Sequence, residues 1–435
     1  MIKKILSWLG LNSSDSPNIQ FGRYSDAFKS ERQMEAWQTS IKEYGKKNYL
    51  ASYRHFFDYL LDQKQENVVV TEQNNRIDFK IYQGSKVVKG FATPEKVVAE
   101  AHIVKYEKSN VAFMRRLLEQ NYSLKYSYFA LSDNTAFLKF HSSTIDSAPD
   151  KLYEAFKEIA TNADKQDDLL LAEFPDLISI NDEHIQEIKI EQKEVKYAYI
   201  HKWITETLAQ IKELDRQKHE STITYLLLNL AYKIDYLVIP QGRLTYELEQ
   251  MSKNVYNDYT LTKATRNNML MQKFKGFLKW NKEDIFKELY NVKSTFGVGV
   301  TTRQKIVSTL IQEEIKSMLN THTSTSALDK IRLEHIPLSA LFHYNMRSHT
   351  HALFALIIEI IYADYVQDLG FESELYDLKI NKLNSPNIQK RLRSIHSKAG
   401  QSHSNFNLSV KSIKFDSLNG FIKSLLLEMK DLDYN

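Results

Sequence analysis

The hydrophobic pattern changes its period near residue 170, and this change constrains the fold more than any other feature. Residues 76–82 alternate polar and apolar side chains, which is the period of a strand with one buried face. Later segments, such as 200–214 and 305–319, place apolar residues every three or four positions, as amphipathic helices do. We therefore expect an α+β part followed by a mainly α-helical part.

The first part is expected to open with helical residues between 34 and 61. Its strand-like segments are 68–70, 76–82, 86–91, 97–105, 124–131 and 136–141. A helix capped by Ser109 or Asn110 separates the fourth and fifth segments, and another opens near Ser147 with Pro149 in its first turn. The expected fold class is α+β, an N-terminal α-β-β-β-α-β-β-α module followed by a mainly α-helical region.

This order of elements resembles a known fold. With Gly84-Ser-Lys-Val-Val-Lys-Gly90 and Val97-Val-Ala-Glu-Ala101, it is similar to the type III secretion chaperone-like fold, also seen in small bacterial regulator domains of the YbjN type. The resemblance covers roughly residues 27–165. It implies a binding module that holds a partner segment on its sheet face and helices, although a fold alone does not assign a role.

The composition along the chain divides it into five parts. An acidic stretch punctuated by Pro175 separates the two structural regions, and a basic stretch closes the chain. The expected parts are an N-terminal segment and linker (1–24), the α+β module (25–170), an acidic connector (171–194), a helical domain (195–370) and a basic C-terminal segment with a final helix (371–435). Within the last part, 375–380 and 408–415 could be short strands, and 383–406 is expected to be a loop.

Several classes of protein are excluded by what the sequence lacks. The chain has no cysteine, which removes disulfides, thiol nucleophiles, iron–sulfur clusters and the common structural zinc sites. The standard phosphate-loop, metalloprotease and hydrolase motifs are also missing. We therefore assign no catalytic, cofactor-binding or metal-binding residue, and we expect no cofactor and a cytoplasmic location.

Two segments bear on membranes. Residues 1–11 form a short amphipathic segment that could dock on its own protein, on a partner or on a membrane surface. The longest apolar helix, 352–366, is interrupted by Glu359 and Asp364 and is too short to span a bilayer. We expect no membrane span.

A buried polar cluster is expected within the helical region. Glu359 lies inside an apolar helix, and a buried carboxylate needs a partner. The expected partners are Arg347, His343 and His351, all of which precede Glu359 in the sequence. A structural ion pair is favoured over a metal or catalytic site, because no two of the histidines are four residues apart on a helix.

The strongest charge asymmetry lies late in the chain. Residues 376–424 carry nine Lys and Arg against two acids, and Lys390, Arg391, Arg393 and Lys398 are the candidates for contacting an anion or nucleic acid. A solvated face is the alternative interpretation. The spacing from Arg391 to His396 also resembles the R-x4-H signature of the HEPN ribonucleases, which implies RNA cleavage, but that family needs the motif on a helix.

Another candidate is Gly297-Val-Gly299, before an expected helix start at Thr301. Its backbone N–H groups could bind an anion, or it could form an ordinary turn between helices. The preferred hypothesis is a non-enzymatic protein-interaction protein with an unidentified protein partner. The alternative is a nucleic-acid-binding or nucleic-acid-cleaving protein that uses the basic segment. A third, weaker hypothesis is an enzyme built around Glu359 and the late histidines. The sequence does not predict the oligomeric state.

Overall fold

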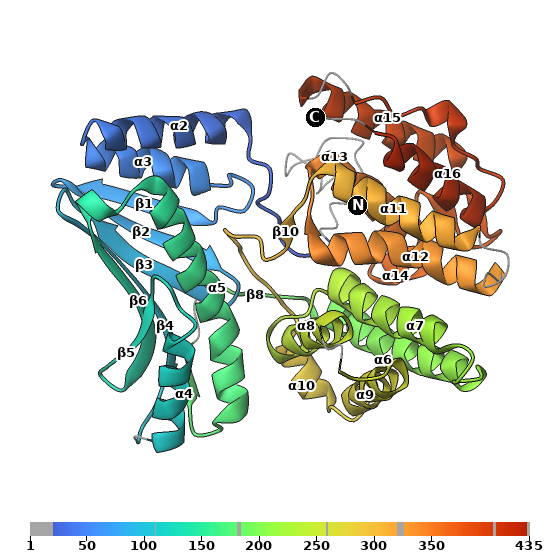
Figure 1. Ribbon diagram of the computed structural model, residues 1–435, viewed down its shortest axis with the longest axis horizontal. Helices are drawn as coiled ribbons and strands as arrows, with labels where there is room; N and C mark the ends of the chain where they lie inside the picture. The colour runs from blue at the N-terminus through green and yellow to red at the C-terminus, as the bar shows by residue number, and fades with distance from the viewer. Residues whose placement is uncertain are drawn as a thin grey trace, which may run out of the picture.

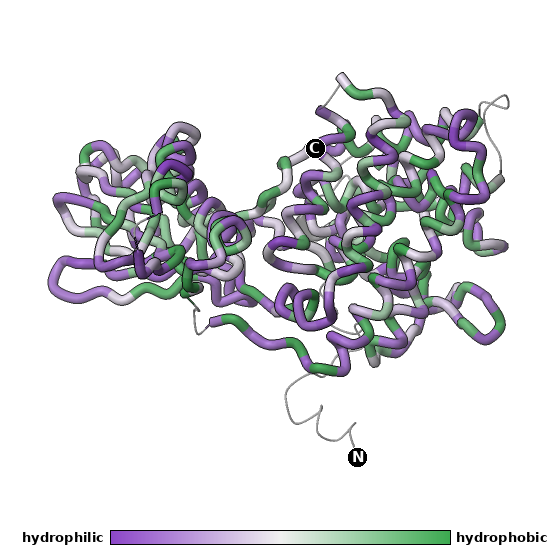
Figure 2. The backbone as a smooth tube through the Cα atoms, turned by 90° about the horizontal axis from the view of Figure 1, so that it is seen from below, coloured by the Kyte–Doolittle hydropathy of each residue, from purple (hydrophilic) through white to green (hydrophobic). Residues whose placement is uncertain are grey.

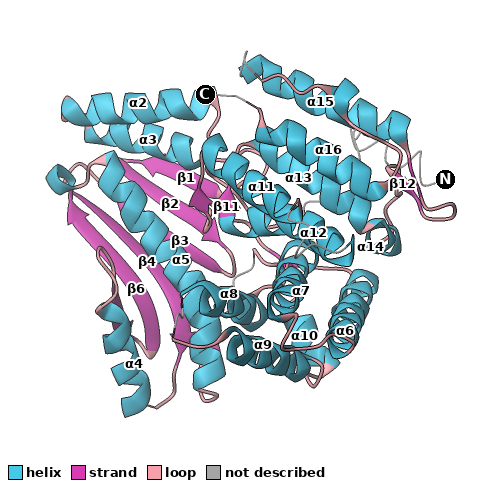
Figure 3. Cartoon of the chain, turned by 45° about the vertical axis from the view of Figure 1, so that its right-hand side comes forward, coloured by secondary structure: helices cyan, strands magenta, loops and turns pink. Residues whose placement is uncertain are grey.

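The α+β fold class is confirmed by a computed structural model. The structure describes residues 21–108, 110–180, 184–257, 260–319, 326–402 and 406–432, so the amphipathic segment 1–11 lies outside it. Figure 1 shows a sheet-containing module beside a helical region, and Figure 3 shows that the long strands belong to the first of these. Among the residues described, no helix combines the length and apolar character that a bilayer crossing needs.

The module is one antiparallel sheet with helices on one face. Its elements are α2 (Glu31–Gly45), α3 (Tyr49–Leu60), β1 (Val68–Gln73), β2 (Arg76–Gln83), β3 (Lys86–Ala92), β4 (Lys96–Lys105), α4 (Val111–Asn121), β5 (Tyr128–Ser132), β6 (Thr135–Ser143) and α5 (Pro149–Glu173). The strands lie in the order β1-β2-β3-β4-β6-β5. The module has one strand and one helix more than the expected order: β1 is a full strand, and the opening helical stretch divides near Lys47.

Alternation along β2 explains the packing of this sheet. Phe79, with the isoleucines on either side of it in β2, is buried on the face that α3 and α5 cover. The Phe79 ring lies 4.7 Å from that of Phe57 on α3 and 5.2 Å from that of Phe156 on α5, between centroids. Asn110 caps α4 as expected, whereas Ser147 donates to the Ser143 carbonyl and does not cap α5.

The acidic connector contributes short strands to both bodies of the molecule, the α+β module and the helical region. β7 (Ile178–Ser179) pairs with β4, and β8 (Gln186–Glu187) pairs with β9 (Tyr290–Asn291) in the helical region. The helix α6 begins at Ile190, inside the range that was expected for the connector. The connector therefore pairs with each body through its backbone.

The helical region contains two apolar cores. The first is built mainly by α6 (Ile190–Lys212), α7 (Glu220–Lys233), a π-helical turn (Ile234–Val238), α8 (Gly242–Asn257), α9 (Lys263–Phe277), α10 (Lys282–Lys287) and α14 (Ala363–Asp368). The second is built by α11 (Gln304–Met318), α12 (Ser326–His343), α13 (Ser348–Ile361), α15 (Ser385–Ser402) and α16 (Leu418–Lys430). Short pairs β10 (Val300–Thr301) with β11 (Tyr344–Asn345), and β12 (Tyr376–Asp377) with β13 (Lys382–Leu383), complete the described elements. Figure 2 shows apolar segments inside both bodies.

Two expectations for the late part of the chain are wrong, and one helix there was not expected. The stretch 383–406 is largely the helix α15, because Ile388, Leu392, Ile395 and Ala399 are buried at helical spacing. Residues 408–415 form a single 3₁₀ turn (Val410–Ser412) and no strand. The helix α12 was missed, because it contains Pro337 in its interior, where proline normally breaks a helix.

Two further segments join the bodies. The loop after β9 returns to the sheet, where the backbone N–H groups of Thr295 and Phe296 donate to Gln83 Oε1 at 3.1 and 2.9 Å. The Phe296 side chain is 1% exposed and belongs to the core of the α+β module. The N-terminal stretch 21–29 runs between the bodies too, and Gly22 N donates to the Tyr236 carbonyl at 2.8 Å. Among the described residues, three segments therefore cross between the two bodies, in addition to the packing of α5 against α8.

Candidate functional site

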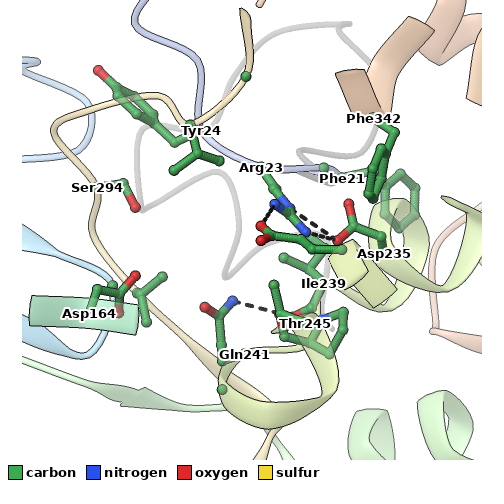
Figure 4. Close-up of a pocket in the computed structure, with 18 of the residues that line it drawn as sticks. Phe21, Arg23, Tyr24, Asp164, Asp235, Ile239, Gln241, Thr245, Ser294 and Phe342 are labelled. Carbon is green, nitrogen blue, oxygen red and sulfur yellow. Dashed lines mark hydrogen bonds and ion pairs between the residues drawn. The ribbon is translucent and has the colours of Figure 1, made fainter. Parts of the chain in front are cut away.

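A cleft of about 1360 Å³ lies between the α+β module and the helical region. The module contributes residues of the β2–β3 turn and of α5, and the helical region contributes residues of α8, α12 and the loop after β9. Figure 4 shows side chains from both bodies facing this space. A hollow lined from two bodies is the usual place for a ligand, so it is the candidate functional site.

Arg23 forms one wall of the cleft. Its Nε donates to Asp235 Oδ1 at 3.0 Å (Figure 4), and its guanidinium also forms an ion pair with Glu249. The same group lies 5.4 Å from the centre of the Phe342 ring. Burial raises the pKa of Asp235, and the positive charge of Arg23 opposes that rise. The wall is therefore an ion network that fixes the N-terminal stretch on the helical region.

Four carboxylates gather at a second wall: Asp164 and Asp168 line the cleft, and Asp167 and Glu288 lie close enough to raise the pKa of Asp168. Asp164, Asp167 and Asp168 share one face of α5, because they are three and four residues apart, and Glu288 follows α10. Burial and then the charge of Asp167 raise the pKa of Asp164 to about 7. Burial raises the pKa of Glu288 to about 7. The pKa of Asp168 is raised well above its usual value by burial, then by Asp167, Asp164 and Glu288. These acids repel one another in a poorly solvated place.

Hydroxyl and imidazole groups form the third wall. Tyr232 OH lies 3.1 Å from Ser252 Oγ and 3.0 Å from His343 Nε2. Burial, followed by the charge of Arg23, lowers the pKa of His343 to about 4, so its ring is neutral near pH 7. Ser252 is 2% exposed, which leaves its hydroxyl poorly placed to attack a substrate. This group can donate and accept hydrogen bonds to a ligand.

The expected partners of Glu359 are corrected by the structure. Glu359 Oε2 is paired with Arg391 Nη2 of α15, 3.4 Å away, and not with Arg347 or the histidines. Burial raises the pKa of Glu359, and Arg391 opposes that rise. The Arg391 partner was missed because α15 was expected to be a loop.

The remaining members of the expected cluster lie among other groups. Arg347 lies over the Phe28 ring, 5.0 Å from its centre. His351 lies on α13 near the Tyr236 ring, with centroids 6.3 Å apart, and burial lowers its pKa to about 4. His343 is the member that reaches the cleft.

The basic candidates lie on α15. Lys390, Arg393 and Lys398 are exposed, whereas Arg391 is partly buried against Glu359. The R-x4-H spacing is therefore on a helix, not in a loop. His396 Nδ1 accepts the Leu408 N–H at 3.3 Å, so both motif side chains contact neighbouring elements.

The glycine-containing loop binds a carboxylate of its own chain. Gly297 N donates to Asp26 Oδ1 at 2.8 Å, and the Gly299 carbonyl accepts from Asn345 Nδ2 at 2.7 Å. Asp26 also accepts a hydrogen bond from Tyr153 OH at 3.0 Å. The loop forms a turn between β9 and β10, and the N–H of Gly297 already donates to Asp26.

Within the described ranges, no group of three or more His, Asp or Glu side chains has an arrangement that could hold a metal ion. Comparison with protein-family models and with curated proteins finds no match. The site therefore has to be interpreted from its own geometry.

Sequence reasoning missed most of this site. The spacing of Asp164, Asp167 and Asp168 on a helix with an apolar opposite face was visible, yet these acids were assigned only to the α+β module and to no site. Arg23 was assigned to a linker. Neither assignment could anticipate that Glu288 lies near Asp168, because the two residues are far apart in the sequence.

Proposed function

We propose that this chain is a protein-interaction protein that binds a segment of a partner protein in the cleft between its two bodies. The observation that carries the proposal is the cleft itself, which is open, about 1360 Å³ in volume and lined from both bodies. The resemblance of residues 27–165 to chaperone-like modules supports the same role, since it implies that such modules hold partner segments.

The size and lining of the cleft favour a polypeptide segment. Pockets for small ligands usually measure roughly 300–1,000 Å³, which is less than this cleft offers. Its lining mixes aromatic rings with charged groups, as interfaces that recognise proteins do. Tyr246, Tyr256 and Phe342 are among these rings.

A crosslinking experiment identifies the partner. A photoreactive phenylalanine replaces Tyr246 inside the cleft or Tyr122, which is 96% exposed on the α+β module. We expect a specific protein crosslinked at position 246 and absent at position 122. The same proteins crosslinked equally at both positions would contradict the proposal.

The purified partner then tests the cleft directly. Ser294→Trp adds bulk to the cleft wall, and Ser123→Trp makes the same change on an exposed surface of the module. We expect Ser294→Trp to weaken binding at least tenfold by calorimetry and Ser123→Trp to change it less than twofold. Equal affinity of the two variants would contradict the proposal.

A second candidate function is nucleic-acid binding by α15. The favouring observation is that Lys390, Arg393 and Lys398 are exposed on one helix, so their charges are fixed along one element. Phosphate contacts of this kind release counterions and make binding strongly salt-dependent. Nucleic-acid cleavage is proposed only as an extension of this candidate.

Fluorescence anisotropy with a labelled single-stranded RNA and a labelled DNA duplex tests it. We expect Lys390→Ala with Arg393→Ala to weaken binding and to lower the salt dependence by about two phosphate contacts. Lys80→Ala with Lys89→Ala, on the sheet, is the matched control. No binding at low salt would eliminate this candidate.

A further inference from the structure

The four neighbouring carboxylates, of which Asp164 and Asp168 line the cleft, differ in their partners. Asp164 accepts from Ser85 N at 2.7 Å, Asp167 forms an ion pair with Lys86 at 2.8 Å, and Glu288 accepts from Leu244 N at 3.2 Å. Each of these three bonds holds a piece of the fold in place. The side chain of Asp168, by contrast, has no hydrogen bond or ion pair in the part of the chain that the structure describes, and it lines the cleft.

A second observation comes from Asp167. This residue is 3% exposed, yet its Oδ1 has no hydrogen-bond partner among the described residues. A buried carboxylate oxygen without a partner costs free energy. One lysine, Lys86, therefore meets a group of four acids. The group lacks the positive charge that would hold all four carboxylates ionised, which is why the pKa of Asp168 lies well above its usual value.

Two lysines of the cleft lining are engaged elsewhere. Lys165 Nζ lies 5.6 Å from the centre of the Tyr246 ring, and Lys196 Nζ donates to the Val238 carbonyl at 2.6 Å. Arg243, near Glu288, stacks over Trp280 at 4.9 Å. These contacts leave Asp168 as the carboxylate available to an incoming group.

The space in front of Asp168 depends on a glycine. A Cβ on Gly242 would lie 2.5 Å from Glu288 Oε2 and 3.2 Å from Asp168 Oδ1, so only glycine lets the two carboxylates approach one another. The described residues do not form a metal site, as noted above. Tyr290 and Tyr246 line the same cleft, and aromatic rings suit an organic cation.

We propose that this wall binds an alkylammonium or guanidinium group, with Asp168 as its counter-ion and Asp164 and Glu288 beside it. The inference rests on the proposed function, in which the group is a lysine or arginine side chain of the bound segment. A free polyamine offers the same chemistry from another source. Charge-assisted bonds to a carboxylate are among the strongest available to such a group.

Peptides of glycine and serine with one central residue test the site by calorimetry on the full chain. The central residue is arginine, lysine or uncharged citrulline, and spermidine is titrated separately. We expect the arginine or lysine peptide to bind at least about tenfold more tightly than the citrulline peptide. Spermidine binding without peptide binding would identify a free polyamine as the source. Failure of all the cations to bind would overturn the proposal.

Substitutions locate the binding. Asp168→Asn and Asp168→Ser should each remove the preference for a cation, whereas Asp176→Asn, an exposed acid beyond α5, should keep it. An unchanged preference in both Asp168 variants would overturn the site. Partner binding that is blocked by Ser294→Trp but unaffected by Asp168→Asn would overturn the cation site alone. Loss of the cation preference without any effect of Ser294→Trp on partner binding would instead contradict the proposed function.

Discussion

The Phe296 ring meets the Tyr153 ring edge-on, with centroids 5.6 Å apart and planes at 72°, inside the core of the α+β module. Phe296 comes from the loop after β9, and Tyr153 comes from α5. A side chain from the second half of the chain thus completes the core of the first half.

This contact predicts the effect of truncating Phe296. Phe296→Ala should lower the free energy of unfolding by about 3–5 kcal/mol, because it leaves a cavity in a packed core. Urea denaturation measures the change. Val298→Ala, at a 54% exposed position of the same loop, should change stability by no more than about 0.5 kcal/mol. A loss below about 1 kcal/mol for Phe296→Ala would show that the insertion contributes little.

The Arg23 network predicts that substitutions of Arg23 and Asp235 have coupled effects on the free energy of unfolding. Arg23→Ala leaves Asp235, which is 4% exposed, without its cation, and should lower the free energy of unfolding by about 3–5 kcal/mol. Adding Asp235→Asn should recover part of this loss. Arg54→Ala breaks an exposed ion pair with Glu72 and should cost no more than about 1 kcal/mol. Equal losses for Arg23→Ala and Arg54→Ala in urea denaturation would contradict the role of the network.

The raised pKa values of Asp164 and Glu288 predict how the stability of the fold depends on pH. The pKa of Asp164 and that of Glu288 are both about 7 in the folded protein, above the usual values of 3.8 and 4.5. The folded state therefore holds these protons more tightly, and the stability that they contribute below pH 4 is lost as the pH rises through 7. Asp164→Asn with Glu288→Gln should flatten the fall in unfolding free energy between pH 4 and 7. Parallel profiles for the variant and the wild type would contradict this prediction.

The lowered pKa of His343 predicts a pH dependence of stability with the opposite sign. Its pKa is lowered from 6.5 to about 4, so the unfolded chain takes up the proton first. The contribution of His343 to stability is present above pH 6.5 and is lost as the pH falls toward 4. His343→Gln should make unfolding less sensitive to acid in this range, as thermal melts at several pH values would show. His141→Gln, at an exposed histidine, controls for the loss of a ring. The idea fails if both variants keep the wild-type acid sensitivity.

The sequence predicted those elements whose pattern is local. The alternation of 76–82 predicted β2, and the apolar spacing of 200–214 and 305–319 predicted α6 and α11. The stretch that forms α15 was expected to be a loop because it is rich in serine, asparagine, glutamine and histidine, which are common both in loops and on exposed helix faces. Its buried residues, such as Leu392, had helical spacing that the polar composition masked.

The cleft could not be predicted in the same way. Its acids Asp164 and Asp168 lie at visible helical spacing, but their meeting with Glu288 depends on how two bodies pack. Similarly, no local pattern marks Phe296 as a core residue of a distant sheet. Such long-range contacts follow from tertiary packing, which periodicity does not describe.

The three crossings between the bodies have a consequence for recognition. With the connector, the stretch 21–29 and the loop bearing Phe296 all tied to both sides, a hinge motion would have to break hydrogen bonds and expose apolar surface. The width of the cleft is therefore set when the chain folds and not when a ligand arrives. A preorganised receptor of this kind loses little conformational entropy on binding, so its selectivity should follow the shape and charge of what enters.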